Sequence, residues 1–386
     1  MAPWIVPLAD VRVPEEDIAA VADVYRSGWL SMGPRTEELE TALAEYTGAR
    51  HALAVANCTA GLHLINLAAG LGPGDEVIVP SLTFVATVNA VAYTGATPVF
   101  ADIAGLDEPW LSAAAAEAAI TERTKAIVSM TYAGHPGETA ELLALAERRG
   151  LVLLEDAAHG AGTRVDGRHV GTFGAAGAFS FFSNKNLAVG EGGAVVCDDD
   201  EIAARMRLLR SHGMTTLSWD RHKGHATGYD VVGLGFNYRI DEPRAALATR
   251  RLARLDGENE RRARLVEAYE RELAPIDGVT LVPRLDPQAD AGVRLAHHLA
   301  AIVLDEGLDR DGFRASLHAA GVQTSLHYPP VHGFSAYASD EPRELPLTEA
   351  FSARAVTIPL FAHMTAEQLE TVVGAIRAAV ETAVAA

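Results

Sequence analysis

The feature that most constrains the fold is an alternation of amphipathic helical patterns with short apolar runs between about residues 36 and 250. The apolar runs are continuous, which is typical of strands buried on both faces. Helical patterns separate them, as in a mostly parallel sheet covered by helices. Helices are predicted at 36–48, 59–72, 83–95 and 139–150, and strands at 51–57, 75–81, 97–103, 124–134 and 151–158.

The pattern changes twice farther along the chain. Residues 162–196 contain closely spaced glycines and short aromatic runs, which predict antiparallel pieces. Residues 241–276 predict one long charged helix, and an isolated strand at 297–304 and a helix at 309–321 indicate a smaller α+β unit. We therefore expect an α/β fold with a large domain and its N-terminal segment at 1–250, and a small C-terminal domain at 251–386.

The net charge and the cysteine content exclude several classes of binding partner and site. The 386 residues include 32 basic and 51 acidic ones, for a net charge of −19, so neither nucleic acid nor an anionic membrane is expected to bind. Cys58 and Cys197 lie far apart without a C-x-x-C spacing, so neither a disulfide framework nor a metal site is expected. No leader pattern or run of ~18 apolar residues is found, so we expect a soluble cytoplasmic protein.

One lysine lies in an unusual context. The stretch FSFFSNKNLAVGEGG, residues 179–193, places Lys185 after an aromatic strand-like run and before a series of glycines. Most lysines in such places are solvated. A desolvated lysine loses its proton readily and forms Schiff bases, so Lys185 is also a candidate for covalent catalysis.

A carboxylate follows a predicted central strand. In LVLLEDAAHGAG the apolar run delivers Asp156 to the carboxyl end of the strand, where ligands of open α/β sheets bind. Alone, Asp156 is more often a turn cap. With His159 close by and Lys185 farther along, it fits pyridoxal 5′-phosphate (PLP), which needs a lysine for its aldehyde, an acid for its ring nitrogen and a phosphate cradle.

The cradle has a candidate in ANCTAGLHL, where a strand gives way to a helix. The backbone N–H groups of Cys58, Thr59 and Ala60 are predicted to face an anion at the helix N-terminus. An ordinary N-cap is the competing interpretation. Ser180 is placed to reach the same phosphate, and Phe84 could stack on a ring, although an isolated phenylalanine is more often core.

Several of these segments resemble the DegT-like sugar aminotransferases, PLP enzymes of the aspartate-aminotransferase fold. The resemblance covers nearly the whole chain and includes LGPGDEVIVPSLTFVATVNAV, GATPVFADI, LEDAAHGAGT, FSFFSNKNLAVGEGGAVV, LGFNYRIDEPRAALA and HYPPVH. It implies a homodimer with shared active sites. It also implies these roles: Lys185 bonded to PLP, Asp156 on the pyridine nitrogen, Phe84 on the ring, His159, Ser180 and the Cys58–Thr59 turn completing the site, and Asn237 reaching the neighbouring subunit's phosphate.

The resemblance also implies a reaction. Related sugar dehydratases have a histidine in place of this lysine, so Lys185 favours transamination of a keto nucleotide sugar, with glutamate as the expected donor. Histidine at position 159, where many relatives have glutamine, favours amination at C4 over C3. Relatives often have Gly-Thr where this chain has Cys58 and Thr59, and a backbone cradle tolerates that change unless the turn requires a positive φ.

Two stretches are candidates for substrate recognition. SWDRHKGHATGYD contains Arg221 and Lys223 in an otherwise acidic protein, and a diphosphate needs such donors, but a solvated loop is equally plausible. SLHYPPVH places His327, Tyr328 and His332 on a proline-stiffened turn that resembles the sugar-facing loop of the family.

Three alternatives are open. A nicotinamide-dependent oxidoreductase shares the α/β pattern, but no complete G-x-G-x-x-G follows a strand. A catalytically silent PLP-binding regulator is a second alternative, although none of the motifs is broken. A keto-cyclitol is the third, as a different substrate for the same chemistry.

Overall fold

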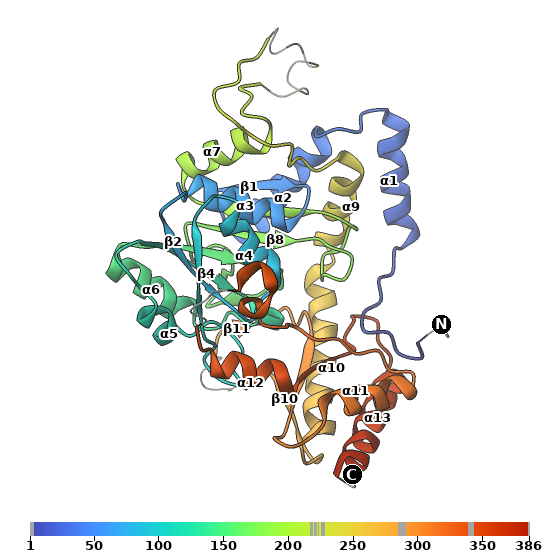
Figure 1. Cartoon of the computed structure of the whole chain (residues 1–386). Helices are drawn as coiled ribbons and strands as arrows, with labels where there is room; N and C mark the ends of the chain where they lie inside the picture. The colour runs from blue at the N-terminus through green and yellow to red at the C-terminus, as the bar shows by residue number, and fades with distance from the viewer. Residues whose placement is uncertain are drawn as a thin grey trace.

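A seven-stranded sheet forms the centre of the larger part of the molecule (Figure 1). The structure is a computed structural model that describes residues 4–216, 219, 222, 224, 228–284, 291–338 and 343–384. Across the sheet the order is β1 (His51–Val55), β9 (Gly193–Cys197), β8 (Ala176–Ser180), β5 (Val152–Asp156), β4 (Thr124–Met130), β2 (Glu76–Pro80) and β3 (Thr97–Ala101). Only β9 runs antiparallel to its neighbours among these strands, so the predicted mostly parallel sheet is confirmed.

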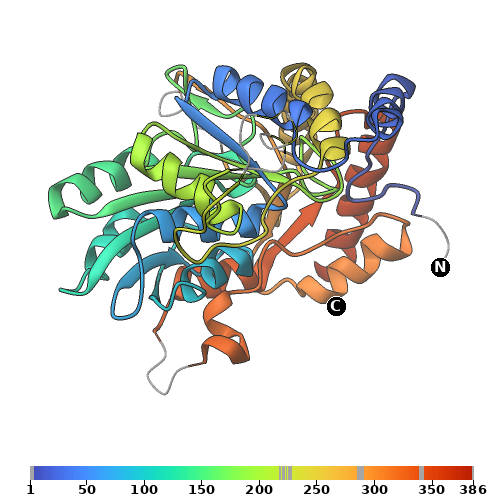
Figure 2. The same ribbon diagram turned by 90° about the horizontal axis from the view of Figure 1, so that it is seen from above.

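Helices cover both faces of this sheet (Figure 2). Adjacent residues of a strand point to opposite faces, and β4 illustrates the consequence. Val128 belongs to the core that contains Leu62 of α3, while Ile127 belongs to the core that contains Leu142 of α6. The helices around the sheet are α2 (Pro34–Thr47), α3 (Cys58–Ala68), α4 (Val85–Ala92), α5 (Ala113–Ala118), α6 (Thr139–Arg149) and α7 (Asp200–Arg210).

Local signals fix several helix ends. Gly48 ends α2 with φ 79°, and Gly150 ends α6 with φ 66°, both in the left-handed region that favours glycine. Asn57 caps α3, because its side chain accepts a hydrogen bond from the backbone N–H of Ala60. The predicted helices and strands of this region lie where the sequence places them, except that the predicted strand at 124–134 ends at Met130 and residues 132–134 form a 3-10 turn.

A second, three-stranded antiparallel sheet forms the core of the C-terminal part, with strand order β10 (Val279–Val282), β12 (Ala300–Leu304) and β13 (Ala355–Ile358). Helices α10 (Leu255–Leu273), α11 (Arg310–Ala319) and α13 (Ala366–Val384) pack around it. The N-terminal segment joins this part: Val6 pairs with Val322 and shares its core. The observed parts have the predicted α/β and α+β character, and the boundary at residue 250 stays a prediction.

The described residues form several further elements. A small sheet links β6 (Arg164–Val165), β7 (Arg168–His169) and β11 (Val293–Arg294). The antiparallel pairs β6–β7 and β8–β9 confirm the prediction for residues 162–196. The other elements are α1 (Glu15–Ser27), α9 (Glu242–Leu252), α12 (Pro346–Arg354) and the 3-10 turns η1 (Tyr132–Gly134), η2 (Val331–Gly333) and η3 (Ser335–Tyr337). Among the described residues, no helix combines the length and apolar character needed to cross a membrane.

The predicted long charged helix at 241–276 is wrong in one respect. It is two helices, α9 and α10, separated at Ala253 and Arg254. The N–H of Arg254 bonds to the carbonyl of Arg251, a tighter turn than α-helix geometry. At the break, the Arg254 guanidinium forms two hydrogen bonds of 2.9 and 2.6 Å with the buried carboxylate of Asp17. Helical periodicity on each side of the break did not reveal it.

Candidate active site

A cavity of about 840 Å³ opens at the edge where the parallel strands end. Ligands of α/β sheets bind at this edge because the strand ends deliver their following residues to one place. Residues that end or follow β1, β2, β4, β5 and β8 line the cavity, joined by the loop before β9 and by a C-terminal loop. Its lining includes Asn57, Cys58, Thr59, Thr83, Phe84, Met130, Asp156, His159, Ser180, Asn184, Lys185, Glu191, His327, Tyr328 and Phe334.

Lys185 lies in the loop between β8 and β9, and its side chain lines the cavity. Its Nζ lies 3.3 Å from Nε2 of His298. Burial lowers the pKa of Lys185 to about 8, while the nearby carboxylate of Asp156 opposes this shift. Lys185 is therefore a desolvated amine and not a solvated strand cap, which is the kind of amine that covalent chemistry uses.

Asp156 ends β5 and is only 3% exposed. Its carboxylate accepts a 2.6 Å hydrogen bond from the Thr87 hydroxyl and a 3.1 Å bond from the N–H of Ala158. Burial raises the pKa of Asp156, and these two bonds together with the charge of Lys185 act against that rise. A cationic partner at this carboxylate would also act against that rise.

His159 and Tyr328 connect the sheet edge to the C-terminal loop. The hydroxyl of Tyr328 lies 2.9 Å from Nε2 of His159. The Nδ1 atom of His159 is buried and has no hydrogen-bond partner in the described part of the chain. Burial lowers the pKa of His159 well below its usual value, and Lys185 adds to this shift, so the ring is neutral. Phe84 is 56% exposed and lines the cavity, so it is not a core residue. The centre of its ring lies 6.1 Å from that of Tyr328.

The helix N-terminus beside these residues differs in one detail from the prediction. The N–H of Ala60 is not free, because the Asn57 side chain accepts it at 2.8 Å, and Ala60 does not line the cavity. The N–H groups of Cys58 and Thr59 are the remaining donors of the first turn that lie at the cavity. Ser180, at the end of β8, lines the same cavity.

Three other predicted site residues, Asn237, Arg221 and Lys223, are not placed at the cavity by the structure. Asn237 is exposed and does not line the cavity of its own chain. Arg221 and Lys223 lie outside the described residues, so their role stays a prediction.

The loop residues after β12 and α11 lie as follows. His327 lines the cavity, and its Nδ1 lies 2.8 Å from the Thr357 hydroxyl. His332 does not line the cavity, which corrects the prediction. The chain enters η2 after Pro330, and the ring of His332 bonds to Ser81 at 2.6 Å and to Glu349 at 3.2 Å instead.

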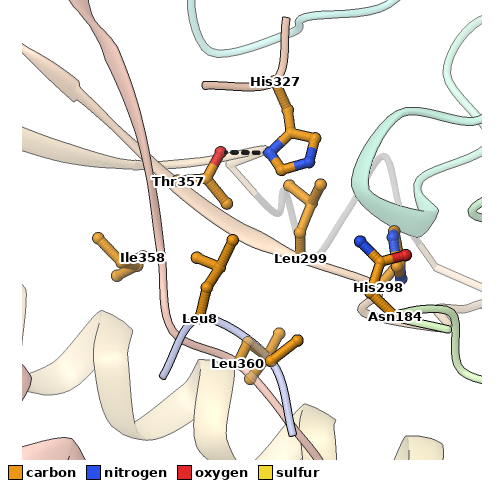
Figure 3. A pocket seen from close by; sticks show the side chains of 9 residues that line it. Leu8, Asn184, His298, Leu299, His327, Thr357, Ile358 and Leu360 are labelled. Atoms are coloured by element: carbon orange, nitrogen blue, oxygen red, sulfur yellow. Dashed lines mark hydrogen bonds between the residues drawn. The ribbon is translucent and has the colours of Figure 1, made fainter. Parts of the chain in front are cut away.

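A second cavity, of about 20 Å³, lies beside the first and shares Asn184 and His327 with it (Figure 3). His298 is part of its wall. The sequence did not indicate His298, which is 113 residues from Lys185 and lies within the predicted strand at 297–304. Thr87, the partner of Asp156, was missed as well, because it lies inside a helical pattern.

The residues at the cavity fit PLP. The cofactor needs an amine, an acid for its pyridine nitrogen and donors for its phosphate, and Lys185, Asp156 and the first turn of α3 supply these. The unpartnered Nδ1 of His159 is one further polar atom that a bound group could satisfy. Within the described ranges, no group of three or more histidine, cysteine, aspartate or glutamate side chains is placed to hold a metal ion.

The fold and the cavity are those of a PLP-dependent aminotransferase of the aspartate-aminotransferase type. A model of the DegT/DnrJ/EryC1/StrS aminotransferase family matches residues 12–377. The chain therefore belongs to this family, as its sequence resemblance implies.

Solved structures agree with this assignment. The aminotransferase TlmJ from Streptoalloteichus hindustanus is 33% identical, with a TM-score of 0.91 over 99% of this chain and 100% of that chain. DesV of S. venezuelae is 38% identical, with a TM-score of 0.88 over 98% of each chain. Spr1654 from Streptococcus pneumoniae, described as a sugar aminotransferase and solved in a PLP form, is 26% identical, with a TM-score of 0.90 over 98% and 99% of the two chains.

Proposed function

We propose that the enzyme moves an amino group from an amino acid, with glutamate as the first candidate, to the keto group of a nucleotide-linked sugar. The main supporting observation is that Lys185 and Asp156 line one cavity at the carboxyl edge of the sheet. The description of Spr1654 as a sugar aminotransferase and the resemblance of the HYPPVH loop support a sugar acceptor.

Each cavity residue has a proposed task. PLP, when bound, supplies an aldehyde that condenses with amines and a ring that accepts electrons. Cys58 and Thr59 would bind its phosphate through their N–H groups, and Ser180 would add a hydroxyl. Asp156 would keep the proton on the ring nitrogen. Lys185 Nζ, when free, would act as a base that takes the proton from the Cα of the donor, and then as an acid that gives it to the former aldehyde carbon of the cofactor.

The residues proposed to face the sugar and the cofactor ring lie at one cavity. Tyr328 and His327 line the cavity, and Tyr328 contacts His159, which supports a sugar-facing role for this loop. We propose that Phe84 lies over the cofactor ring, since its exposed side chain has open cavity beside it. With histidine rather than glutamine at position 159, we propose amination at C4 over C3.

The proposed active unit is a homodimer in which Asn237 serves the neighbouring site. Asn237 is exposed, and a short stretch before it exposes apolar side chains, including Leu234 at 95%, Val232 and Tyr229. Isolated exposed apolar residues are ordinary, but several close together are typical of an interface. We also propose a cytoplasmic location, with which the free thiols of Cys58 and Cys197 agree.

Two assays test the proposed function. In the first, the purified enzyme is mixed with glutamate alone and the absorbance of its cofactor is followed. We expect the cofactor band to shift with glutamate, and a protein that binds PLP but does not respond to any amino donor would be the silent regulator instead.

In the second assay, the aminated enzyme is offered keto nucleotide sugars with the ketone at C4 or at C3, and a keto-inositol. We expect turnover with a 4-keto nucleotide sugar, with the new C–N bond located by NMR of the product. Preference for the 3-keto sugar would overturn the C4 proposal, and preference for the keto-inositol would establish the cyclitol alternative.

A further inference from the structure

A chain of buried hydrogen bonds reaches Lys185 from the C-terminal part of the molecule. Asn186 Nδ2 donates to Asn259 Oδ1 and to the carbonyl of Ala296, both at 2.7 Å. Asn186 Oδ1 lies 3.0 Å from Nδ1 of His298, and Nε2 of His298 lies 3.3 Å from Lys185 Nζ. The side chains of Asn186, Asn259 and His298 are buried, so these bonds are protected from water.

This chain determines which nitrogen of His298 carries the proton. The carbonyl of Ala296 can only accept, so the amide nitrogen of Asn186 must face it, and Asn186 Oδ1 must face His298. Because that oxygen is an acceptor, Nδ1 of His298 must be the donor. In a neutral imidazole the other nitrogen, Nε2, then has a lone pair, and it points to Lys185 Nζ.

The surroundings keep the His298 ring neutral. Burial lowers the pKa of His298 well below its usual value, and the charge of Lys185 lowers it further. His159, Arg262 and His327 also face the ring and act in the same direction. On the other side, Asp156 and Cys58 are the titratable groups that favour the charged form of Lys185.

We propose that His298 is a positioning residue for Lys185: its Nε2 accepts a hydrogen bond from Nζ and holds the free amine in the cavity. The inference rests on the proposed role of Lys185, which must stay in place whenever its amine is free. A lysine side chain has about 2 kcal/mol of rotamer entropy, so a fixed acceptor limits where Nζ can go. The same bond stabilises the ammonium form, because an ammonium donates more strongly than an amine.

A matched pair of variants separates this role from simple packing. His298→Leu fills a similar space without an acceptor, whereas His298→Gln can present an amide oxygen to Nζ. The readout is the pH profile of Lys185 acetylation in the apoenzyme by acetic anhydride, with the modified peptide quantified by mass spectrometry. This readout needs neither cofactor nor sugar.

We expect the wild-type profile to have its midpoint near pH 8, where burial places the pKa of Lys185. Loss of one hydrogen bond to the ammonium should move the midpoint of His298→Leu down by roughly 1 pH unit, while His298→Gln stays near the wild type. A common midpoint for all three proteins, each shown to be folded by thermal unfolding, would overturn the proposal. So would equal shifts in the Leu and Gln variants, which would indicate packing.

A second measurement extends the test to cofactor loading. At a pH above both midpoints, where Lys185 is a free amine in all three proteins, the rate at which added PLP becomes bonded to Lys185, trapped by borohydride, should fall about tenfold in His298→Leu and recover in His298→Gln. An unchanged rate in His298→Leu would contradict the positioning role. If wild-type PLP is trapped on another lysine, the proposed function fails, and this result is distinct from any effect of His298.

Discussion

Replacement of Asp156 by asparagine tests the central electrostatic element of the site. The two side chains have nearly the same shape, and the hydrogen bonds show that asparagine can be accommodated. Its oxygen can keep the bond from Ala158 N–H, and its NH2 group can donate to the Thr87 hydroxyl. The Thr87 hydroxyl would then donate to Thr83, 2.7 Å away. The fold should therefore survive and only the charge is lost.

The expected magnitude follows from the burial of this carboxylate. Asp156 is 3% exposed, so its pairing with a protonated ring nitrogen would be little screened by water. Removal of one partner from a buried charge pair costs about 3–5 kcal/mol, which corresponds to a roughly 150- to 5000-fold slower step. We expect this loss in single-turnover reactions with glutamate followed by stopped-flow absorbance.

The stability of the apoenzyme should change in the opposite direction. Burial raises the pKa of Asp156, so the folded state disfavours the ionised carboxylate. The stability that the protonated Asp156 side chain contributes is therefore lost as pH rises through its folded pKa. Asparagine is neutral at every pH. The Asp156→Asn apoenzyme should therefore unfold at the same temperature as the wild type at pH 7, or at a higher one.

A matched control is available three strands away in the sheet, beyond β4 and β2. Asp102 follows β3 at the same edge of the sheet but lies outside the cavity, where it accepts hydrogen bonds from Thr348. Asp102→Asn should leave the single-turnover rate unchanged even if it lowers stability. A near-normal rate for Asp156→Asn, or an equal loss for Asp102→Asn, would refute the reasoning.

Three further predictions concern other parts of the molecule. Lys185→Ala should abolish turnover, and substantial activity of the purified variant without added amines would contradict the assignment. Mixed Lys185→Ala and Asn237→Ala subunits should regain activity above the sum of the unmixed variants, because one site of each heterodimer then has neither change; no gain after verified exchange would refute sharing of sites. Glu242, 1% exposed, accepts bonds at the start of α2 from the N–H groups of Gly33, Arg35 and Thr36, so Glu242→Ala should lower the free energy of unfolding by about 3 kcal/mol. An unchanged urea midpoint would contradict this last expectation.

Sequence by itself determined the alternating helices and strands of the large sheet and the carboxyl ends of its strands. A strand whose side chains are apolar on both faces must be buried on both faces to keep them from water. The apolar run before Asp156 therefore predicts a central strand, with the carboxylate at its carboxyl end. Asn57 and Gly48 are local signals whose effect does not depend on distant residues, and the structure places helix ends at both. These features follow from interactions between residues that are close together in the sequence.

Only the tertiary structure decided which distant side chains meet. His298 contacts Lys185 because the C-terminal sheet packs against the loop after β8, and no periodicity within either segment encodes that contact. The same reason explains the turn of His332 toward Ser81 and the break in the charged helix where Arg254 meets Asp17. Local patterns specify which residues are buried, but the choice of partner among buried groups depends on packing between segments that are far apart in the chain.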